Sequence, residues 1–196
     1  MLSSDISERI ADLEKELLEK QQALAELRRE MPPEPVKDYV LQTTSGPAKL
    51  SKMFGDKPNL TLIHNMGKGC SYCTLWADGF NGEVDHLQDR AAFVVCSSDA
   101  PKVQAEFAAS RGWRFPMVSS ADTSFTADMG DMQGKSGPWP GVSTFRKNDD
   151  GSIARIAHCS LGPGDAFCGV WHLFNLLEGG PGDWQPKNSY ESATSS

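Results

Sequence analysis

The sequence lacks several features that would assign a function class at sight. Its 196 residues contain no run of 18 apolar residues, so we expect no membrane-spanning segment. The first residues show neither the basic start nor the apolar stretch of a secretory signal, which favours a reducing, cytoplasmic location. Basic residues are outnumbered, and the net charge of -7 argues against nucleic acid or an anionic membrane as a main partner.

Cysteine is also scarce, with five residues of which only Cys70 and Cys73 lie close together. An odd, scattered set of cysteines is not a disulfide framework. A structural zinc site needs four ligands, commonly from two Cys-x-x-Cys pairs, and the chain has no second pair. We therefore expect a functional dithiol with no metal and no cofactor. Inert structural thiols, or a metal site that recruits a histidine, are the alternatives.

The surroundings of Cys70 and Cys73 predict redox chemistry. An apolar run at residues 60–66 leads through glycines into the Cys-x-x-Cys motif, which opens a segment with helical character. At a helix start Cys70 would face unpaired backbone N–H groups and the positive end of the helix dipole, which favour a thiolate. Cys73, one turn later, could close an intramolecular disulfide.

Residues 5–30 predict one long amphipathic helix, so residues 1–31 form an N-terminal segment that ends at the prolines after Met31. Its apolar residues alternate spacings of three and four, with Lys20 and Gln21 interrupting the stripe. They are Ile6, Ile10, Leu13, Leu17, Leu24, Leu27 and Met31. A helix with one narrow apolar stripe must bury it on its own domain or on a partner copy. We expect a homodimer through this helix.

The remaining pattern predicts an α/β domain at residues 36–178, followed by a polar C-terminal tail at residues 179–196 that need not fold. Strands are expected at residues 39–41, 60–66, 91–96, 115–119, 142–146 and 153–159, a loop at 135–141, and helices after Cys70, at 49–54, from Pro101, at 122–129 and at 167–177. Gly79 and Gly82 are expected to break the helix after Cys70. Parallel strands joined by helices and followed by a hairpin indicate a mixed central sheet flanked by helices, the thioredoxin-like fold.

Three segments carry a family resemblance. Gly69-Cys-Ser-Tyr-Cys73, Trp76-Ala-Asp-Gly-Phe-Asn-Gly82 and Gly112-Trp-Arg-Phe-Pro-Met-Val-Ser-Ser120 resemble the domain-of-unknown-function family 899. The resemblance extends from the N-terminal helix to about residue 178. It implies a thioredoxin-like fold and little about the reaction.

Two positions are similar to those of thioredoxins. Pro140 lies where thioredoxins carry the cis-proline that faces the dithiol, which implies a role in shaping the substrate groove. His64 lies six residues before Cys70, at the spacing of the buried aspartate that moves a proton from the second cysteine. A neutral imidazole could serve as that base. An ordinary trans loop proline and a packed strand histidine are the alternatives.

Residues 100–130 resemble the insertion of peroxiredoxins, with two departures. Those peroxidases carry a threonine three residues before the reactive cysteine, where this chain has Gly67. Many also place an arginine before the segment that corresponds to Ser143-Thr-Phe145, and none is present here. Thiol peroxidase activity is therefore the weaker prediction.

Further side chains are candidates for the site. Trp76 and Trp139 could form an apolar wall for a substrate, and Lys68 could stabilise a thiolate at Cys70. Each has a simpler interpretation as a core tryptophan or a solvated lysine. Cys96 reads as a small buried hydrophobe, and the environment of Cys159 cannot be read from the sequence. Cys168 and His172 share a helix face at metal-ligand spacing, although core packing and chance are the better explanation.

The leading prediction is a thioredoxin-like thiol–disulfide oxidoreductase acting on a protein or small-molecule disulfide or thiol. Cys70 would attack as the thiolate and Cys73 would resolve the mixed disulfide. The alternative is a scaffold or redox-sensing interaction protein that oligomerises through its N-terminal helix.

Overall fold

The computed structural model describes residues 2–130 and 139–190. In chain order its elements are α1 (Leu2–Glu30), β1 (Glu34–Val36), β2 (Val40–Thr43), β3 (Gly46–Lys49), the short 3-10 helix η1 (Leu50–Lys52), β4 (Asn59–His64), α2 (Ser71–Arg90), β5 (Ala92–Ser97), α3 (Pro101–Arg111), β6 (Met117–Ser119), α4 (Phe125–Met129), β7 (Gly141–Lys147), β8 (Ile153–Ser160) and α5 (Gly169–Phe174). The loop expected at residues 135–141 lies outside the described residues up to position 138.

The described strands form one mixed sheet in the order β1-β8-β7-β4-β5-β6-β2-β3. β4, β5 and β6 run parallel, and β7 and β8 form the antiparallel hairpin that the sequence predicted. β4 lies at the centre, between β5 and β7, where both faces are covered. Its short apolar run therefore forms a buried strand, and the turn that leads to Cys70 begins at the carboxyl end of this strand.

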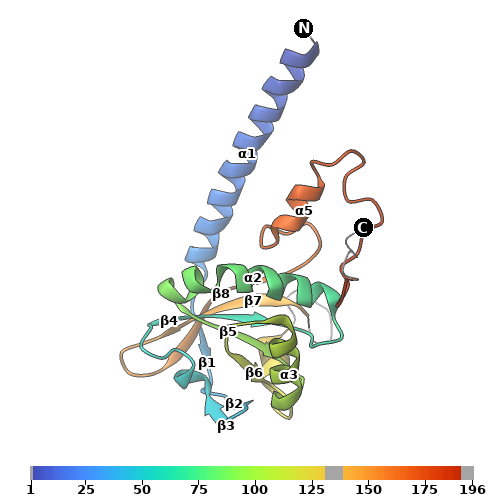
Figure 1. The fold of residues 1–196 in the computed structure, drawn as a ribbon. Helices are drawn as coiled ribbons and strands as arrows, with labels where there is room; N and C mark the ends of the chain where they lie inside the picture. The colour runs from blue at the N-terminus through green and yellow to red at the C-terminus, as the bar shows by residue number, and fades with distance from the viewer. Residues whose placement is uncertain (1, 131–138, 191–196) are drawn as a thin grey trace.

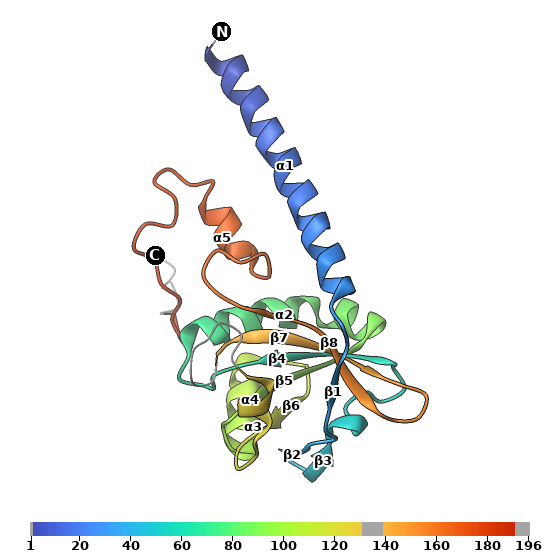
Figure 2. The same ribbon diagram turned by 180° about the vertical axis from the view of Figure 1, so that it is seen from behind.

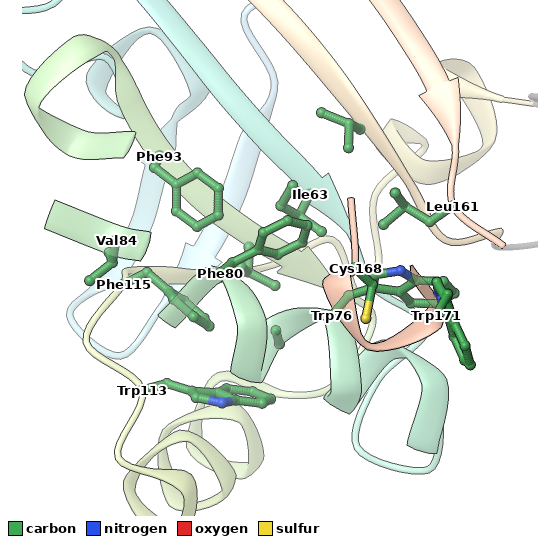
Figure 3. Close-up of a cluster of buried hydrophobic side chains, with 13 residues drawn as sticks. Ile63, Trp76, Phe80, Val84, Phe93, Trp113, Phe115, Leu161, Cys168 and Trp171 are labelled. Carbon is green, nitrogen blue, oxygen red and sulfur yellow. The ribbon is translucent and has the colours of Figure 1, made fainter. Parts of the chain in front are cut away.

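Two apolar clusters fill the two faces of this sheet. One cluster packs beneath α2 and includes Ile63, Phe80 and Phe93, as Figure 3 shows. The other packs on the opposite face and includes Leu60, Leu62 and Phe125. Successive side chains of a strand point to opposite faces, so Ile63 lies on the face of α2 and its neighbours in β4 lie on the other. This alternation decides which site residues can meet.

Helix α2 is longer than the sequence predicted. It runs unbroken through Gly79 and Gly82, where we expected a break. Each glycine costs a helix roughly 1 kcal/mol relative to alanine. Phe80 and Val84, between and after the glycines, are 6% and 1% exposed. The free energy gained by burying these two side chains against the sheet outweighs the cost of the glycines. This burial cannot be predicted from the local sequence alone.

The sheet also has edges that the sequence pattern did not reveal. β1 pairs with β8, although it contains Pro35 and only three residues. β3 contains Pro47 and pairs with β2 across a tight turn, where we expected a turn followed by a helix. Proline is tolerated in both because edge strands do not need every N–H for pairing. α5 is shorter than the helix expected at residues 167–177.

The long N-terminal helix is confirmed as α1, which projects away from the domain in both views (Figures 1 and 2). Its contact with the sheet is made to β8, near its C-terminal end. In the described part of the chain, no helix combines the length and the apolar character needed to cross a membrane.

Candidate functional site

Cys70 lies at the N-terminal end of α2, as its position before a helical segment predicted. It is the N-cap residue, with an extended backbone, and its Sγ accepts a hydrogen bond from the Cys73 backbone N–H at 3.0 Å. The sulfur thus takes the place of the oxygen that usually caps a helix. The thiol is half-buried, whereas Cys73 is only 2% exposed. Cys70 is therefore the sulfur that a substrate can reach.

The two cysteines have opposite acidities. A hydrogen bond from the Cys73 side chain lowers the pKa of Cys70 most strongly, and the backbone N–H groups of Cys73 and Tyr72 lower it further. Together they outweigh partial burial and bring the pKa of Cys70 to about 7. The same hydrogen bond, with burial, raises the pKa of Cys73 far above its ordinary value. Cys70 is therefore the thiol that loses its proton near neutral pH, whereas Cys73 keeps its own.

The turn before Cys70 is held by a set of hydrogen bonds. The Asn65 side-chain oxygen accepts from the Gly67 N–H at 2.7 Å, and a carboxylate oxygen of Asp99 accepts from the Lys68 N–H at 2.7 Å. The Met66 N–H donates to the Cys73 sulfur at 3.4 Å. These contacts fix the approach of the chain to Cys70 and supply polar partners for the buried sulfur of Cys73.

Gly67 is required by this turn. Its φ of 102° is rarely adopted by residues with a side chain, and a Cβ built there would lie 2.7 Å from an Asp99 carboxylate oxygen. A threonine at this position would therefore have to displace Asp99. The departure from the peroxiredoxin pattern seen in the sequence is thus part of the local geometry.

Pro140 and Trp139 lie beside the same turn by strand register. Gly141, the first residue of β7, pairs with His64 at the carboxyl end of β4, so the two preceding residues flank the segment that leads to Cys70. Pro140 is buried and its carbonyl accepts from the Leu161 N–H at 2.9 Å, while Trp139 is half-buried. The Trp139–Pro140 peptide bond is trans. This placement is compatible with the groove-shaping role expected of Pro140.

The structure does not bring His64 to the dithiol, which corrects the proton relay expected of it. Its side chain lies on the face opposite α2, stacks on Phe125 and shares a 2.8 Å hydrogen bond with the Ser143 hydroxyl. Burial, with the nearby positive charge of Arg155 and then of His158, lowers the pKa of His64 to about 4. Sequence spacing placed the residue at the correct strand end but on the wrong face.

Trp76 and Lys68 also differ from their expected roles. Trp76 is 2% exposed and lies within the core cluster beneath α2, beside Trp171 and Cys168 (Figure 3), so it cannot form a substrate wall. Lys68 has an exposed side chain and contributes to the turn through its backbone. The aromatic ring nearest Cys70 in the chain is Tyr72, half-buried and stacked on Trp171 with centroids 6.1 Å apart.

The other cysteines lie away from the helix start. Cys96 is 3% exposed, as expected of a small buried hydrophobe, and burial raises its pKa to about 12. Burial also raises the pKa of Cys159 and of Cys168. Cys168 is buried in the core, whereas the exposed His172 contacts the Asp165 carbonyl at 3.2 Å. Within residues 2–130 and 139–190 no group of three or more potential ligands is placed to hold a metal.

Besides the Asn65 and Asp99 side chains that hold the turn, sequence reasoning missed the segment after residue 179. This segment descends to the N-terminal end of α2 in both overall views (Figures 1 and 2). The Asn188 side-chain amide donates to the Lys68 carbonyl at 3.2 Å, and the Asn188 carbonyl accepts from Arg111 at 2.7 Å. A polar tail of this composition carries no periodic signal, so only the structure shows that it reaches the turn before Cys70.

The described elements have a thioredoxin-like fold, and the dithiol lies at a helix start within it. The structure is similar to that of reduced Prx3 from Vibrio vulnificus in complex with hydrogen peroxide, with 14% identity, a TM-score of 0.52 and coverage of 69% of this chain and 90% of that one. A hypothetical protein of Sinorhizobium meliloti 1021 has 16% identity, a TM-score of 0.52 and coverage of 69% and 75%. Peroxidoxin BcpB of Mycobacterium tuberculosis has 25% identity and a TM-score of 0.49, and the match covers 65% of this chain and 84% of that one.

The chain belongs to the DUF899 family, described as bacterial protein of unknown function, whose model matches residues 6–192. The resemblance found in the sequence is therefore confirmed, and the match continues past residue 178 into the segment that holds the turn before Cys70. Among curated proteins, none matches the chain.

Proposed function

We propose that this protein is a thiol–disulfide oxidoreductase that reduces or exchanges disulfides through Cys70 and Cys73. The observation that carries the proposal is the split acidity of the pair, with the accessible Cys70 at a pKa of about 7 and the buried Cys73 held protonated. The attacking thiol in such reactions works best when its pKa is near the ambient pH.

The proposed reaction proceeds in two exchanges. The Cys70 thiolate attacks one sulfur of a substrate disulfide, so a mixed disulfide forms and the other substrate sulfur leaves as a thiolate. Cys73 then loses its proton to a departing thiolate or water and attacks the Cys70 sulfur. A Cys70–Cys73 disulfide forms and the second substrate thiol is released. Two electrons pass from the protein to the substrate, and an external dithiol restores the pair.

The roles of neighbouring groups follow from their positions. The Met66 N–H, which contacts the Cys73 sulfur, would stabilise the thiolate that Cys73 becomes during the second exchange. Pro140 and Trp139 flank the approach to Cys70 and would bound the substrate groove. No proton-relay residue is assigned, because His64 lies on the other face of the sheet.

Reduction of insulin disulfides with dithiothreitol as the external dithiol tests the proposal. We expect wild-type protein to accelerate the reaction and Cys70→Ser to lose the acceleration completely. Cys96→Ser is the matched control, because it removes a buried thiol of the neighbouring strand and should retain activity. A Cys73→Ser variant should accumulate mixed disulfides on Cys70. The proposal fails if Cys70→Ser is as active as wild type.

A peroxide assay on the same variants addresses the weaker alternative. Gly67 cannot be replaced by threonine without moving Asp99, so the site lacks the group that peroxiredoxins place beside their reactive sulfur. We therefore expect hydrogen peroxide to be consumed much more slowly than disulfides by wild-type protein. Faster turnover of peroxide than of disulfide would favour the peroxidase.

A further inference from the structure

Helix α1 presents an apolar stripe that the described chain leaves uncovered. Its large apolar side chains remain about half exposed or more, namely Ile6 at 58%, Ile10 at 52%, Leu13 at 61%, Leu17 at 57%, Leu24 at 47% and Leu27 at 62%. The helix leaves the sheet at its C-terminal end and extends into solvent over most of its length (Figure 1). Among residues 5–30, Ala25 and Arg28, near that end, are the only ones that are half-buried.

The stripe has the spacing of a coiled-coil seam. Its members fall at successive separations of four, three and four residues, which places Ile10, Leu17 and Leu24 at one core position of a heptad and Ile6, Leu13 and Leu27 at the other. The run covers about four heptads, which is the length at which such a seam becomes informative. A lone helix of this kind is marginal in water unless its apolar face is packed.

We propose that the occupant of this stripe is the α1 helix of a second copy of the same chain. The residues beside the seam have complementary charge. In a parallel pair, Arg9 of one copy faces Glu14 of the other, five residues further along the chain. In an antiparallel pair that sets Leu13 against Leu24, Arg9 faces Glu30 of the other copy instead. Either direction therefore gives two attractive pairs by symmetry.

The charge of α1 disfavours the other plausible occupant, a lipid surface. Residues 2–30 carry eight acidic and five basic side chains, a net charge of -3. Helices that lie on membranes carry lysine and arginine on their polar face and are attracted by anionic lipids. α1 would be repelled, whereas a second copy offers both signs of charge at the seam.

Lys20 is the exception within the seam and supports a specific role for it. It occupies the heptad position between Leu13 and Leu27, so the seam would hold two charged side chains, both in one layer of a parallel pair or one in each of two layers of an antiparallel pair. A polar residue at a single core position costs stability and restricts register and oligomer size. The expected assembly is therefore a dimer of moderate affinity.

Sedimentation equilibrium of the full chain, under reducing conditions and at micromolar concentration, tests the proposal. We expect a mass twice the 21.4 kDa of one chain. Leu17→Glu should raise the dissociation constant by at least about 100-fold, because it buries a charge in the seam. Lys20→Leu should lower the constant. Cys70→Ser should remain dimeric, so assembly is tested separately from the reaction.

Leu18→Glu is the matched control. Leu18 adjoins Leu17, is 54% exposed against 57%, and falls outside the seam, so the substitution should leave the dimer intact. Circular dichroism of each variant checks that the domain is folded. The proposal is overturned by a monomeric wild type, by equal effects of the Leu17 and Leu18 substitutions, or by a monomer that cosediments with vesicles of anionic phospholipid.

Discussion

Cys70 and Cys96 occupy two different environments, which give their thiols different exposure and different acidity. Cys70 follows β4 and caps α2, where N–H groups and the Cys73 thiol point at its sulfur. Cys96 lies within β5, paired with His64 and 3% exposed. Their pKa values of about 7 and about 12 result from these surroundings. A helix start thus makes a thiol reactive, and a strand interior makes it inert.

The largest expected effect is the difference in alkylation rate between Cys70 and Cys96. At pH 7 in the native state, iodoacetamide should modify Cys70 at least about 1,000-fold faster than Cys96, because roughly half of the Cys70 thiol is ionised and almost none of the Cys96 thiol is. Peptide mapping by mass spectrometry distinguishes the five cysteines. The rate at Cys70 should rise with pH through about 7 and then level off. Equal labelling of both sites would show that the helix start does not set reactivity.

His64, which pairs with Cys96 across the two strands, gives the second prediction. The folded state holds a neutral His64 with a pKa of about 4, whereas the unfolded chain binds that proton near pH 6.5. Unfolding is therefore favoured as the pH falls from about 6.5 to 4, by up to about 3 kcal/mol. His64→Gln, which can still bond to Ser143, should lose that part of the acid sensitivity in urea unfolding at about pH 7 and pH 4.5.

The same variant also tests the placement of His64. Because the residue lies on the face opposite α2, His64→Gln should leave the pH dependence of Cys70 alkylation unchanged. A shift in the midpoint of this pH dependence would instead support the proton-relay role that the sequence spacing predicted for His64.

A smaller effect is expected from removing the hydrogen bond between the two thiols. Cys73→Ala should raise the pKa of Cys70 from about 7 toward that of an ordinary thiol, since the donor that lowers it most is lost. Cys73→Ser is the matched control, because its hydroxyl can still donate and should preserve part of the shift. The ultraviolet absorbance of the thiolate follows the titration. Identical midpoints in all three proteins would mean that the backbone N–H groups alone set the acidity.

The smallest effect concerns the C-terminal segment. Asn188→Ala removes the hydrogen bond to the Lys68 carbonyl, which is worth about 1 kcal/mol, and should loosen the turn before Cys70. Hydrogen exchange of peptides containing Met66 to Gly69 should accelerate by about fivefold. Lys187→Ala, which changes an exposed neighbour, should not alter that exchange. Unchanged protection in Asn188→Ala would show that the segment does not support the site.

Much of this architecture was readable in the sequence, for local reasons. The apolar run of β4, the spacing of Cys70 and Cys73 and the hairpin of β7 and β8 depend on nearest neighbours and short periods, which a single sequence displays. The length of α2 was not readable, because burial of Phe80 and Val84 against the sheet outweighs two glycines. The edge strands β1 and β3 were also hidden, because each contains a proline and becomes a strand through pairing, with the distant β8 and with the adjacent β2, and not through propensity.

The candidate site divides in the same way. The sequence by itself determined that Cys70 would precede a helix and that Cys73 would lie one turn further on, because both follow from chain spacing. Only the tertiary structure decided that His64 lies on the far face, that Trp76 is core, and that Asp99 and Asn188 support the turn. Those contacts join residues 31 to 120 positions apart in the chain, and only the packing of the whole sheet brings them together.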